Sequence, residues 1–163
     1  NNLIAYGDYG LVPAILYSSN GGNSFTLIYH SQYNPLQLST GIVDMVFPAN
    51  GTIGYAIDAD RILKTTNKGL SWSAIRIDPA SYFSFLEAVD NNNVFAYSTG
   101  YKSSKLLKSV NGGNTWVAVP LPAGNDYINC VNFISADKGW LNMRTNTDGK
   151  LYYNKGNERK QLF

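Results

Sequence analysis

Carboxylate side chains are the groups in this sequence that could carry out hydrolysis. A glycosidase requires two carboxylates that face the same cleft. Such a pair could come from aspartates in predicted loops, namely Asp58, Asp60, Asp126 and Asp148. Aspartates in the loops of a β protein more often hold turns or face solvent, because their short side chains bond to nearby backbone. The sequence therefore favours a chain that is not an enzyme, with a glycoside hydrolase as the main alternative.

Histidine and cysteine each occur once, and this excludes several kinds of site. His30 alone cannot build a histidine metal cluster, and no serine or cysteine stands in a nucleophile elbow. Cys130 alone permits neither an intrachain disulfide nor a cysteine zinc site. We expect His30 at the surface or packed in a loop, and Cys130 buried on a strand, because free cysteine is among the most buried residue types. The glycine-rich turns lack the lysine and the helix of a phosphate loop, so we predict no cofactor and no metal.

The composition is that of a globular all-β chain. Aromatic residues make up 13% of the sequence and charged residues 15%, and Tyr, Phe and Val favour strands. The net charge of +2 is too balanced for a nucleic-acid or membrane surface, and no run of 18 apolar residues is present to span a bilayer. Few charges with many Tyr, Asn and Ser predict a secreted, cell-surface or virion location. The chain starts at Asn1 without a visible signal peptide, so either a leader has been removed or the chain is a segment of a longer protein.

Three segments of the chain align without gaps. They are residues 15–25, 62–72 and 106–116, and they share the pattern apolar, Leu, x, Ser/Thr, x, Asn, x, Gly, x, Ser/Thr, aromatic. The closing aromatics are 47 and 44 residues apart. A period of about 45 residues is typical of a propeller blade built from four short strands.

Two further strands precede each copy after the first, with a short polar turn between them. One example is Val43–Phe47 followed by Gly54–Ile57, and Leu3–Tyr6 matches only the second of these strands. We therefore predict about fifteen strands in an all-β chain, a β-propeller segment with about four antiparallel blades of four strands, the first incomplete. The approximate blades are 1–30, 42–77, 83–121 and 127–163, with a degraded repeat in the last one. Because a closed ring removes sheet edges, we expect either a larger propeller or a strand supplied by another chain.

The Asn-x-Gly corners, called Asn turns below, have a predicted structural role. We expect the Asn side chain to lock the turn, the Gly to take a positive φ, and the following hydroxyl to tie the turn. The closing aromatic is expected to pack against the neighbouring blade. The predicted turn residues are Ser18, Asn20, Gly22, Ser24 and Phe25, then Thr65, Asn67, Gly69, Ser71 and Trp72, and then Ser109, Asn111, Gly113, Thr115 and Trp116.

These turns resemble the Asp-box, or bacterial neuraminidase repeat, with Asn where that family usually has Asp. Residues 54–75 look like the blades of photosystem II assembly-factor-like propellers. The resemblance covers nearly the whole chain and implies structural turns at the blade periphery, away from any active centre. The same box occurs in sialidases, xyloglucan-cleaving hydrolases, sortilin-type receptors and many phage and bacterial surface proteins, so it implies a fold more than a function.

Arginines separate this sequence from two of those families. A resemblance to sialidases implies three arginines that clamp a carboxylate, a Tyr–Glu pair and an acidic Asp. The sequence has only Arg61, Arg76, Arg144 and Arg159, none of them in the Arg-Ile-Pro context of that family, and only two Glu, Glu87 and Glu158. In the assembly factors a cluster of arginines engages the partner, whereas here the arginines are few and scattered.

The loops between blades, and those between second and third strands, usually form the binding face of a propeller. Tyr and Arg are enriched in binding hot spots, and the candidates in or near these loops are Tyr33, Tyr82, Tyr101, Tyr127, Arg61 and Arg144. Ordinary half-buried tyrosines at strand ends are the alternative interpretation. We predict a non-catalytic binding or scaffolding module of a surface-exposed, secreted or virion assembly, with a protein partner or further blades. The alternatives are a carbohydrate-binding or sialidase-like propeller and an assembly factor.

Overall fold

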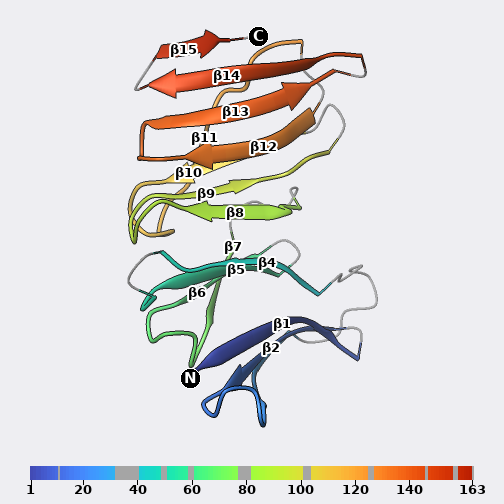
Figure 1. The fold of residues 1–163 in the computed structure, drawn as a ribbon, viewed down its shortest axis with the longest axis vertical. Helices are drawn as coiled ribbons and strands as arrows, with labels where there is room; N and C mark the ends of the chain where they lie inside the picture. The colour runs from blue at the N-terminus through green and yellow to red at the C-terminus, as the bar shows by residue number, and fades with distance from the viewer. Residues whose placement is uncertain are drawn as a thin grey trace. The chain divides into compact units, whose positions relative to one another are not determined.

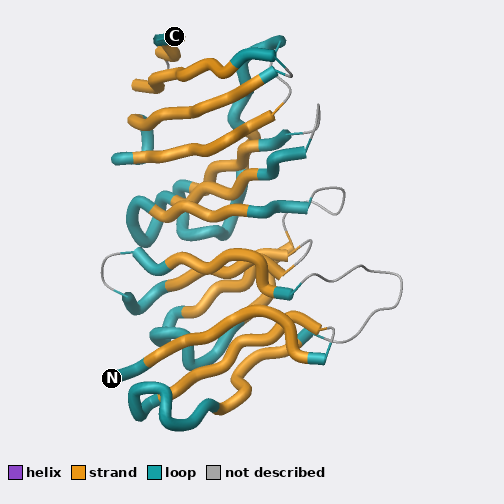
Figure 2. Tube along the Cα trace, turned by 45° about the vertical axis from the view of Figure 1, so that its right-hand side comes forward, coloured by secondary structure: helices purple, strands orange, loops and turns teal. Residues whose placement is uncertain are grey.

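The structure is a computed structural model, drawn as a ribbon in Figure 1 and as a tube in Figure 2. It describes residues 1–10, 12–31, 41–48, 51–58, 61–76, 82–100, 104–124, 127–145, 147–155 and 158–162. The fifteen secondary-structure elements in these ranges are all strands. The same ranges contain no helix that is long and apolar enough to cross a membrane. The chain divides into two compact units, unit one (Asn1–Tyr82) and unit two (Phe83–Phe163).

Unit one holds one three-stranded and one four-stranded sheet. The first sheet contains, in order, β1 (Leu3–Tyr9), β2 (Val12–Ser18) and β3 (Thr26–His30). The second contains β4 (Ile42–Val46), β5 (Gly54–Asp58), β6 (Arg61–Thr65) and β7 (Ser73–Arg76). Within each sheet, every strand pairs antiparallel with the next one along the chain, the pattern that short hairpin connections give.

Unit two holds two four-stranded sheets of the same kind. The first contains β8 (Phe85–Ala88), β9 (Val94–Tyr97), β10 (Leu106–Ser109) and β11 (Val117–Ala118). The second contains β12 (Tyr127–Phe133), β13 (Lys138–Arg144), β14 (Gly149–Lys155) and β15 (Glu158–Gln161). The predicted all-β class and the antiparallel four-stranded sheets are confirmed.

Strand registers align the four sheets residue by residue. The pairs that correspond at the end of the sheet carrying the turns are Leu3–Ser18, Gly54–Thr65, Val94–Ser109 and Gly139–Asn154. β1 therefore corresponds to β5, β9 and β13, which are second strands. In the part of the chain that the structure describes, the first sheet lacks its first strand, as predicted.

Each unit has a core to which both of its sheets contribute. In unit one the buried cluster consists of Ile15, Ile42, Ala56 and Leu63. In unit two it consists of Phe95, Tyr97, Leu106, Ile128, Val131, Leu141, Met143 and Tyr152. Alternate residues of each strand point to one face, so these side chains meet between the two sheets of their unit.

A large side chain on a first strand is matched by a glycine on the second. A Cβ atom added to Gly139 would lie 2.6 Å from Cδ1 of Phe133, the residue paired with it across β12 and β13. Gly54 stands in the same relation to Phe47. In the sheet β8–β11 the corresponding pair is Ala88 on the first strand with Val94 on the second. Here the larger residue of the pair lies on the second strand instead of the first. The volume is conserved across the pair, as close-packed interiors require.

Cys130 is exposed, so the prediction that it is buried is wrong. The register between β12 and β13 shifts between Ile128 and Cys130, which is a β-bulge. A bulge inserts one extra residue and changes which face the following side chains occupy. Without it, Cys130 would share the face of Ile128, which is 1% exposed.

Candidate functional site

The three Asn turns share one set of side-chain hydrogen bonds. The Oδ1 atoms of Asn20, Asn67 and Asn111 accept the backbone N–H four residues later, at 3.0, 3.0 and 2.9 Å. Their Nδ2 atoms donate to the hydroxyl of that same residue at 2.8 to 2.9 Å. The glycine two residues after each Asn takes a positive φ, of 93°, 85° and 82° in chain order, a conformation that glycine adopts without steric cost. The amide group therefore closes the turn as both acceptor and donor.

A second set of hydrogen bonds, not predicted from the sequence, comes from a buried hydroxyl at the end of the preceding strand. Ser18, Thr65 and Ser109 are each 1% exposed. Their oxygens accept the N–H of the turn glycine at 2.9, 3.0 and 2.8 Å, and they donate to Oδ1 of the Asn. Each hydroxyl thereby gives a partner to a turn N–H, and in Gly69 and Gly113 this N–H is buried.

The indole of Trp72 fills the space between the two sheets of unit one. Its Nε1 atom donates to the carbonyl of Gly69 at 3.1 Å, and its ring meets Phe47 edge-on at a centroid distance of 5.9 Å. It also packs against the buried cluster that contains Ile15 and Leu63. Beside it remains a small pocket of about 250 Å³, lined by Asn2, Ile4, Tyr17, Phe47, Gly51 and Lys68.

In the last sheet residues 156 and 157 lie outside the described residues, but the register of β14 with β15 shows which residues stand at the positions of the other sheets' turn residues. In the sheet β4–β7, Ser73 of β7 pairs with Lys64. In the last sheet, Lys160 of β15 pairs with Tyr153 at the same place in the register, so Lys160 corresponds to Ser73. The preceding residue, Arg159, therefore occupies the place of Trp72. Its partner Asn154 occupies the place of the buried hydroxyl.

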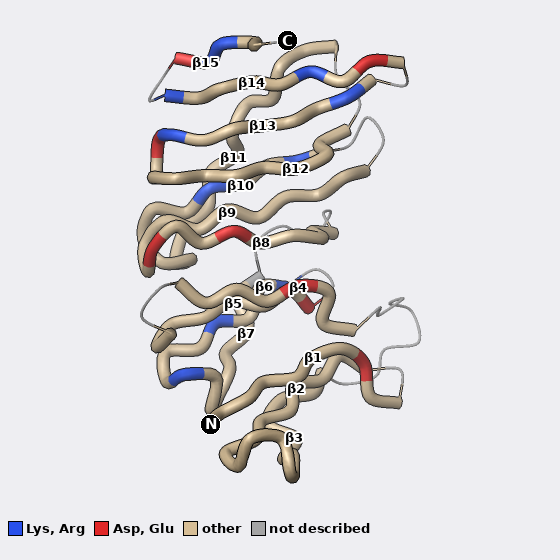
Figure 3. The backbone as a smooth tube through the Cα atoms, viewed as in Figure 1, with Lys and Arg blue, Asp and Glu red and all other residues tan. Residues whose placement is uncertain are grey.

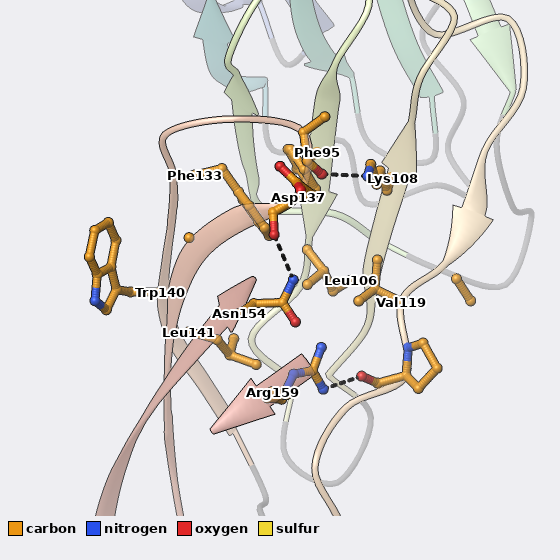
Figure 4. A pocket seen from close by; sticks show the side chains of 14 residues that line it. Phe95, Leu106, Lys108, Val119, Phe133, Asp137, Trp140, Leu141, Asn154 and Arg159 are labelled. Carbon is orange, nitrogen blue, oxygen red and sulfur yellow. Dashed lines mark hydrogen bonds between the residues drawn. The ribbon is translucent and has the colours of Figure 1, made fainter. Parts of the chain in front are cut away.

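A pocket of about 490 Å³ lies between the two sheets of unit two (Figure 4). Leu106 and Val119 face Asn154, Leu141 and Arg159 across it, as Figure 4 shows. Its other lining residues are Phe95, Lys108, Ala118, Pro120, Phe133, Ala136, Asp137, Gly139 and Trp140. The residues at its rim include exposed ones, so the pocket opens to solvent.

The wall of this pocket is aromatic and aliphatic. Phe95 and Phe133 stack face to face with a centroid distance of 3.6 Å and an interplanar angle of 4°. Leu106 and Leu141 are 2% and 4% exposed and belong to the core of the unit. The pocket therefore opens directly onto the hydrophobic core.

Two cationic side chains line the same pocket, and both donate to neutral carbonyls. Lys108 Nζ donates to the carbonyl of Ala136, and Arg159 Nη1 donates to that of Pro120. Arg159 Nε is buried without a partner, and burial lowers the pKa of this guanidinium. Figure 3 marks the basic residues along β10, β14 and β15 in blue.

Asp137 is the carboxylate in the lining of this pocket, and it lies exposed in the turn between β12 and β13. Its Oδ1 accepts the Ser135 hydroxyl at 2.7 Å. This hydrogen bond, more than the nearby lysines, lowers the pKa of Asp137. The pocket thus carries two cations against one solvated anion.

Comparison with known proteins gives the fold. The chain resembles YCF48 bound to a D1 peptide, with a TM-score of 0.58 and 20% identity over 81% of this chain and 44% of that one. It resembles the GH74 enzyme of Niastella koreensis with a TM-score of 0.69 and 18% identity, over 97% of this chain and 27% of that one. The GH74 xyloglucanase of Xanthomonas campestris gives a TM-score of 0.68 and 14% identity, over 99% of this chain and 28% of that one.

The fold is that of β-propeller blades. No family model matches the chain, and no curated protein matches it. The chain spans between about a quarter and a half of the length of these solved structures. The four sheets are blade one (β1–β3), blade two (β4–β7), blade three (β8–β11) and blade four (β12–β15), and the larger pocket lies between blades three and four.

Of the tyrosines and arginines predicted to bind a partner, the four that the structure describes, Tyr82, Tyr127, Arg61 and Arg144, do not line this pocket. Tyr127 and Arg144, which pair across β12 and β13, come together with the guanidinium 4.8 Å from the ring centroid. Tyr82 is 63% exposed. Tyr33 and Tyr101 lie outside the described residues.

Arg61 is part of a different cluster, in blades one and two. Its Nη2 atom donates to Asp58 at 2.7 Å, and the Tyr29 hydroxyl donates to the same carboxylate oxygen at 2.5 Å. Burial, together with the bond to Asp58, raises the pKa of Tyr29. Asp58 was expected in a loop, but it ends β5 and is 1% exposed. Because its charge is already bound by Arg61 and Tyr29, this cluster serves the structure of unit one.

The remaining candidates for chemistry are dispersed. His30 ends β3 and is exposed, as expected. Asp148 is exposed in the turn before β14, and Asp60 and Asp126 lie outside the described residues. Within the described ranges, no three His, Cys, Asp or Glu side chains gather as metal ligands.

Sequence reasoning missed the residues that set this pocket apart from its counterpart in unit one, Arg159 and Asn154. One signal could have found them. The third strand of the last repeat is followed by no aromatic residue at the spacing that the other three repeats keep.

Proposed function

We propose that this chain is a non-catalytic protein-binding part of a propeller, and that the pocket between blades three and four is where it binds. The observation that carries the proposal is the pocket itself. The corresponding space in unit one is filled by Trp72 and retains about 250 Å³, whereas this one has about 490 Å³ and an exposed rim. An open, mostly apolar cavity, at a position where the other unit is filled by a side chain, is a feature of ligand sites.

The polar groups of the pocket support binding over hydrolysis. A glycosidase requires two carboxylates about 5 to 10 Å apart in its cleft. Among the described lining residues, Asp137 is the one carboxylate, and it is exposed and bonded to Ser135. Asp58, the buried aspartate of unit one, is bonded to Arg61 and Tyr29 instead of facing a cleft.

The surroundings of the pocket suit a peptide. Apolar residues form its floor, while backbone carbonyls and basic side chains stand near its rim, the arrangement typical of protein interfaces. A structural neighbour, YCF48, is bound to a D1 peptide. That neighbour supports the peptide class alone, since 20% identity carries no site residues across.

We also infer that the Asn turns are Asp-box repeats in which Asn takes the place of Asp. The Asn Oδ1 atoms accept the turn N–H groups that a carboxylate would accept, so the exchange removes a charge and keeps the acceptor. This inference concerns the scaffold and leaves the binding site unchanged.

Panning a phage-displayed peptide library on the purified chain tests the proposal. Selected peptides are then titrated against the wild type, Arg159→Trp and Lys160→Trp. Arg159 faces the pocket, whereas Lys160 is the next residue on β15, is exposed and points to the other face. We expect Arg159→Trp to abolish binding and Lys160→Trp to leave it intact, with circular dichroism confirming that both variants fold.

Two outcomes would overturn the proposal. One is that no selected peptide loses affinity in Arg159→Trp. The other is that a xyloglucan oligosaccharide, titrated in parallel, binds the wild type and loses its affinity in Arg159→Trp, while the peptides bind both proteins equally well. That result would favour the carbohydrate-binding alternative.

A further inference from the structure

We infer that the pocket between blades three and four takes an aromatic side chain of the partner together with a neighbouring carboxylate of the partner. This inference rests on the proposed function and adds the chemistry of the ligand. It follows from a comparison of corresponding positions in blades two and four.

The aromatic ring that normally closes this space is missing from blade four. Trp72 of blade two packs its indole edge-on against Phe47. In blade four, Phe133 corresponds to Phe47, and Arg159 replaces Trp72. The aromatic surface against which an indole packs is therefore retained while the indole is absent.

The vacated space is large enough to hold a ring. The pocket is about 240 Å³ larger than its counterpart in unit one, since the two volumes are about 490 and 250 Å³. Its wall presents the stacked rings of Phe95 and Phe133 and the side chain of Leu141. Burying a Trp side chain removes about 150–250 Å² of surface from water, which makes it the strongest apolar anchor a peptide can offer.

Cationic groups in the lining favour an aromatic over an aliphatic guest. Arg159 stands where an indole stands in blade two, and guanidinium groups attract the faces of aromatic rings. Arg159 Nη1 is held by the carbonyl of Pro120, so the side chain is fixed at the edge of the pocket. Lys108 already lies 5.8 Å from the ring centroid of Phe95. An aliphatic guest would gain the apolar contacts and lose this attraction.

The charge of the pocket accounts for the carboxylate. Lys108 and Arg159 donate to neutral carbonyls, and the ion pair between Arg61 and Asp58 in unit one involves neither of them. Among the described lining residues, the one carboxylate is that of Asp137, which is exposed. A carboxylate beside the guest ring would therefore meet two cations that no ion pair neutralises, and hydrogen bonds between ionised groups are the stronger ones.

Small probes test the two parts of the inference separately. The ¹⁵N-labelled chain is titrated with N-acetyl-tryptophan, N-acetyl-tryptophan amide and N-acetyl-leucine, and the shifts of the backbone amides are followed by NMR. We expect saturable shifts at Phe133 and Gly139 with N-acetyl-tryptophan. The amide should bind about tenfold more weakly, because it lacks the charge-assisted hydrogen bond. N-acetyl-leucine should give no saturable shift.

Variants assign the effects to residues. Arg159→Trp should abolish the shifts caused by N-acetyl-tryptophan, and Lys160→Trp should leave them unchanged. Lys108→Gln should narrow the difference in affinity between the acid and the amide. Shifts that map outside the pocket, or equal affinity for the leucine and tryptophan probes, would overturn the inference.

The two proposals fail in different ways. Selected peptides that bind, lose affinity in Arg159→Trp and lack any aromatic residue would contradict the inference and leave the proposed function standing. If no peptide depends on Arg159, the proposed function fails and the inference fails with it.

Discussion

The space between blades one and two and the space between blades three and four are built from corresponding residues, but an aromatic ring closes only the first. In unit one, Trp72 follows an Asn turn and its indole lies against Phe47. In unit two, Arg159 stands in that place, and the pocket is about twice as large.

This difference indicates that in blade two the Asn turn also positions the residue that packs between the blades, although Phe25, which follows the Asn turn of blade one, is 44% exposed. The Asn, the glycine and the buried hydroxyl hold the turn so that the aromatic residue five positions after the Asn points between the sheets. In blade four β14 ends at Lys155 and β15 begins at Glu158, whereas in blade two β6 ends at Thr65 and β7 begins only at Ser73. With the turn removed, the aromatic is also removed, and the space it would fill becomes a pocket.

Removing the ring from unit one should have the largest effect. Trp72→Ala is expected to lower the free energy of unfolding by about 3 kcal/mol, because it leaves a cavity between the blades. Trp140→Ala is the matched control, since its ring contacts Tyr153 on one sheet at 5.4 Å. It should cost about 1 kcal/mol. Urea denaturation of both variants measures the difference, and equal losses would contradict the assigned role of Trp72.

Adding a methyl group at the wall of the pocket should have the next largest effect. In Gly139→Ala, the new Cβ would meet Cδ1 of Phe133 at 2.6 Å and the backbone oxygen of Asn132 at 2.5 Å. We expect a loss of about 2 kcal/mol from overpacking. Gly149→Ala, in the same sheet, has nothing within 4 Å of its Cβ position and should leave the stability unchanged. Thermal denaturation of the two variants measures these stabilities. If Gly139→Ala is as stable as the wild type, Phe133 is free to move away from the new methyl group.

Closing the pocket of unit two should stabilise it. Arg159→Trp is expected to raise the free energy of unfolding by about 1 kcal/mol, as cavity-filling substitutions commonly do. Lys160→Trp, on the other face of β15, should change it by less than about 0.5 kcal/mol. A destabilised Arg159→Trp would show that the pocket cannot admit the ring, and denaturant titration is the measurement.

Glu87 offers the smallest and most specific test, because unit one has Val46 at the corresponding position. Burial raises the pKa of Glu87, although the backbone N–H of Phe133 donates to its Oε1 at 2.6 Å. The folded chain therefore keeps this proton to a higher pH than the unfolded chain. The stability that Glu87 contributes is full below about pH 4.3, the ordinary glutamate pKa. It is lost as the pH rises through the higher pKa of the folded state.

Glu87→Gln removes this titration and keeps an oxygen that can accept the Phe133 N–H. Relative to the wild type, the variant should therefore be more stable at pH 7 than at pH 4. Urea denaturation at several pH values gives the difference directly. A difference between the two proteins that does not change with pH would show that Glu87 titrates normally.

Much of the fold could be predicted from the sequence, because the repeat carries its own markers. The pattern around Asn20, Asn67 and Asn111 recurs at a blade-like period, and polar turns mark the first hairpin of each complete blade. These are local signals, since hydrogen bonds within a few residues hold the turns. The missing first strand followed from the same alignment.

The pocket could not be predicted in the same way, because it depends on pairing across strands. The equivalence of Arg159 with Trp72 appears only when β14 and β15 are paired. The contact of Asp58 with Tyr29 joins residues 29 positions apart in two blades. The bulge that exposes Cys130 has no glycine or proline to mark it. In each case a tertiary contact or a shift of register decides the outcome, and neither leaves a local signal.

Arg159 occupies the position of an inter-blade aromatic residue that blade four lacks. A crystal structure of Arg159→Trp tests it most directly. We predict that the new indole lies between blades three and four against Phe133, as Trp72 lies against Phe47, and that the pocket shrinks toward the size of the one in unit one. An indole that turns out to solvent, with the pocket unchanged, would contradict the account.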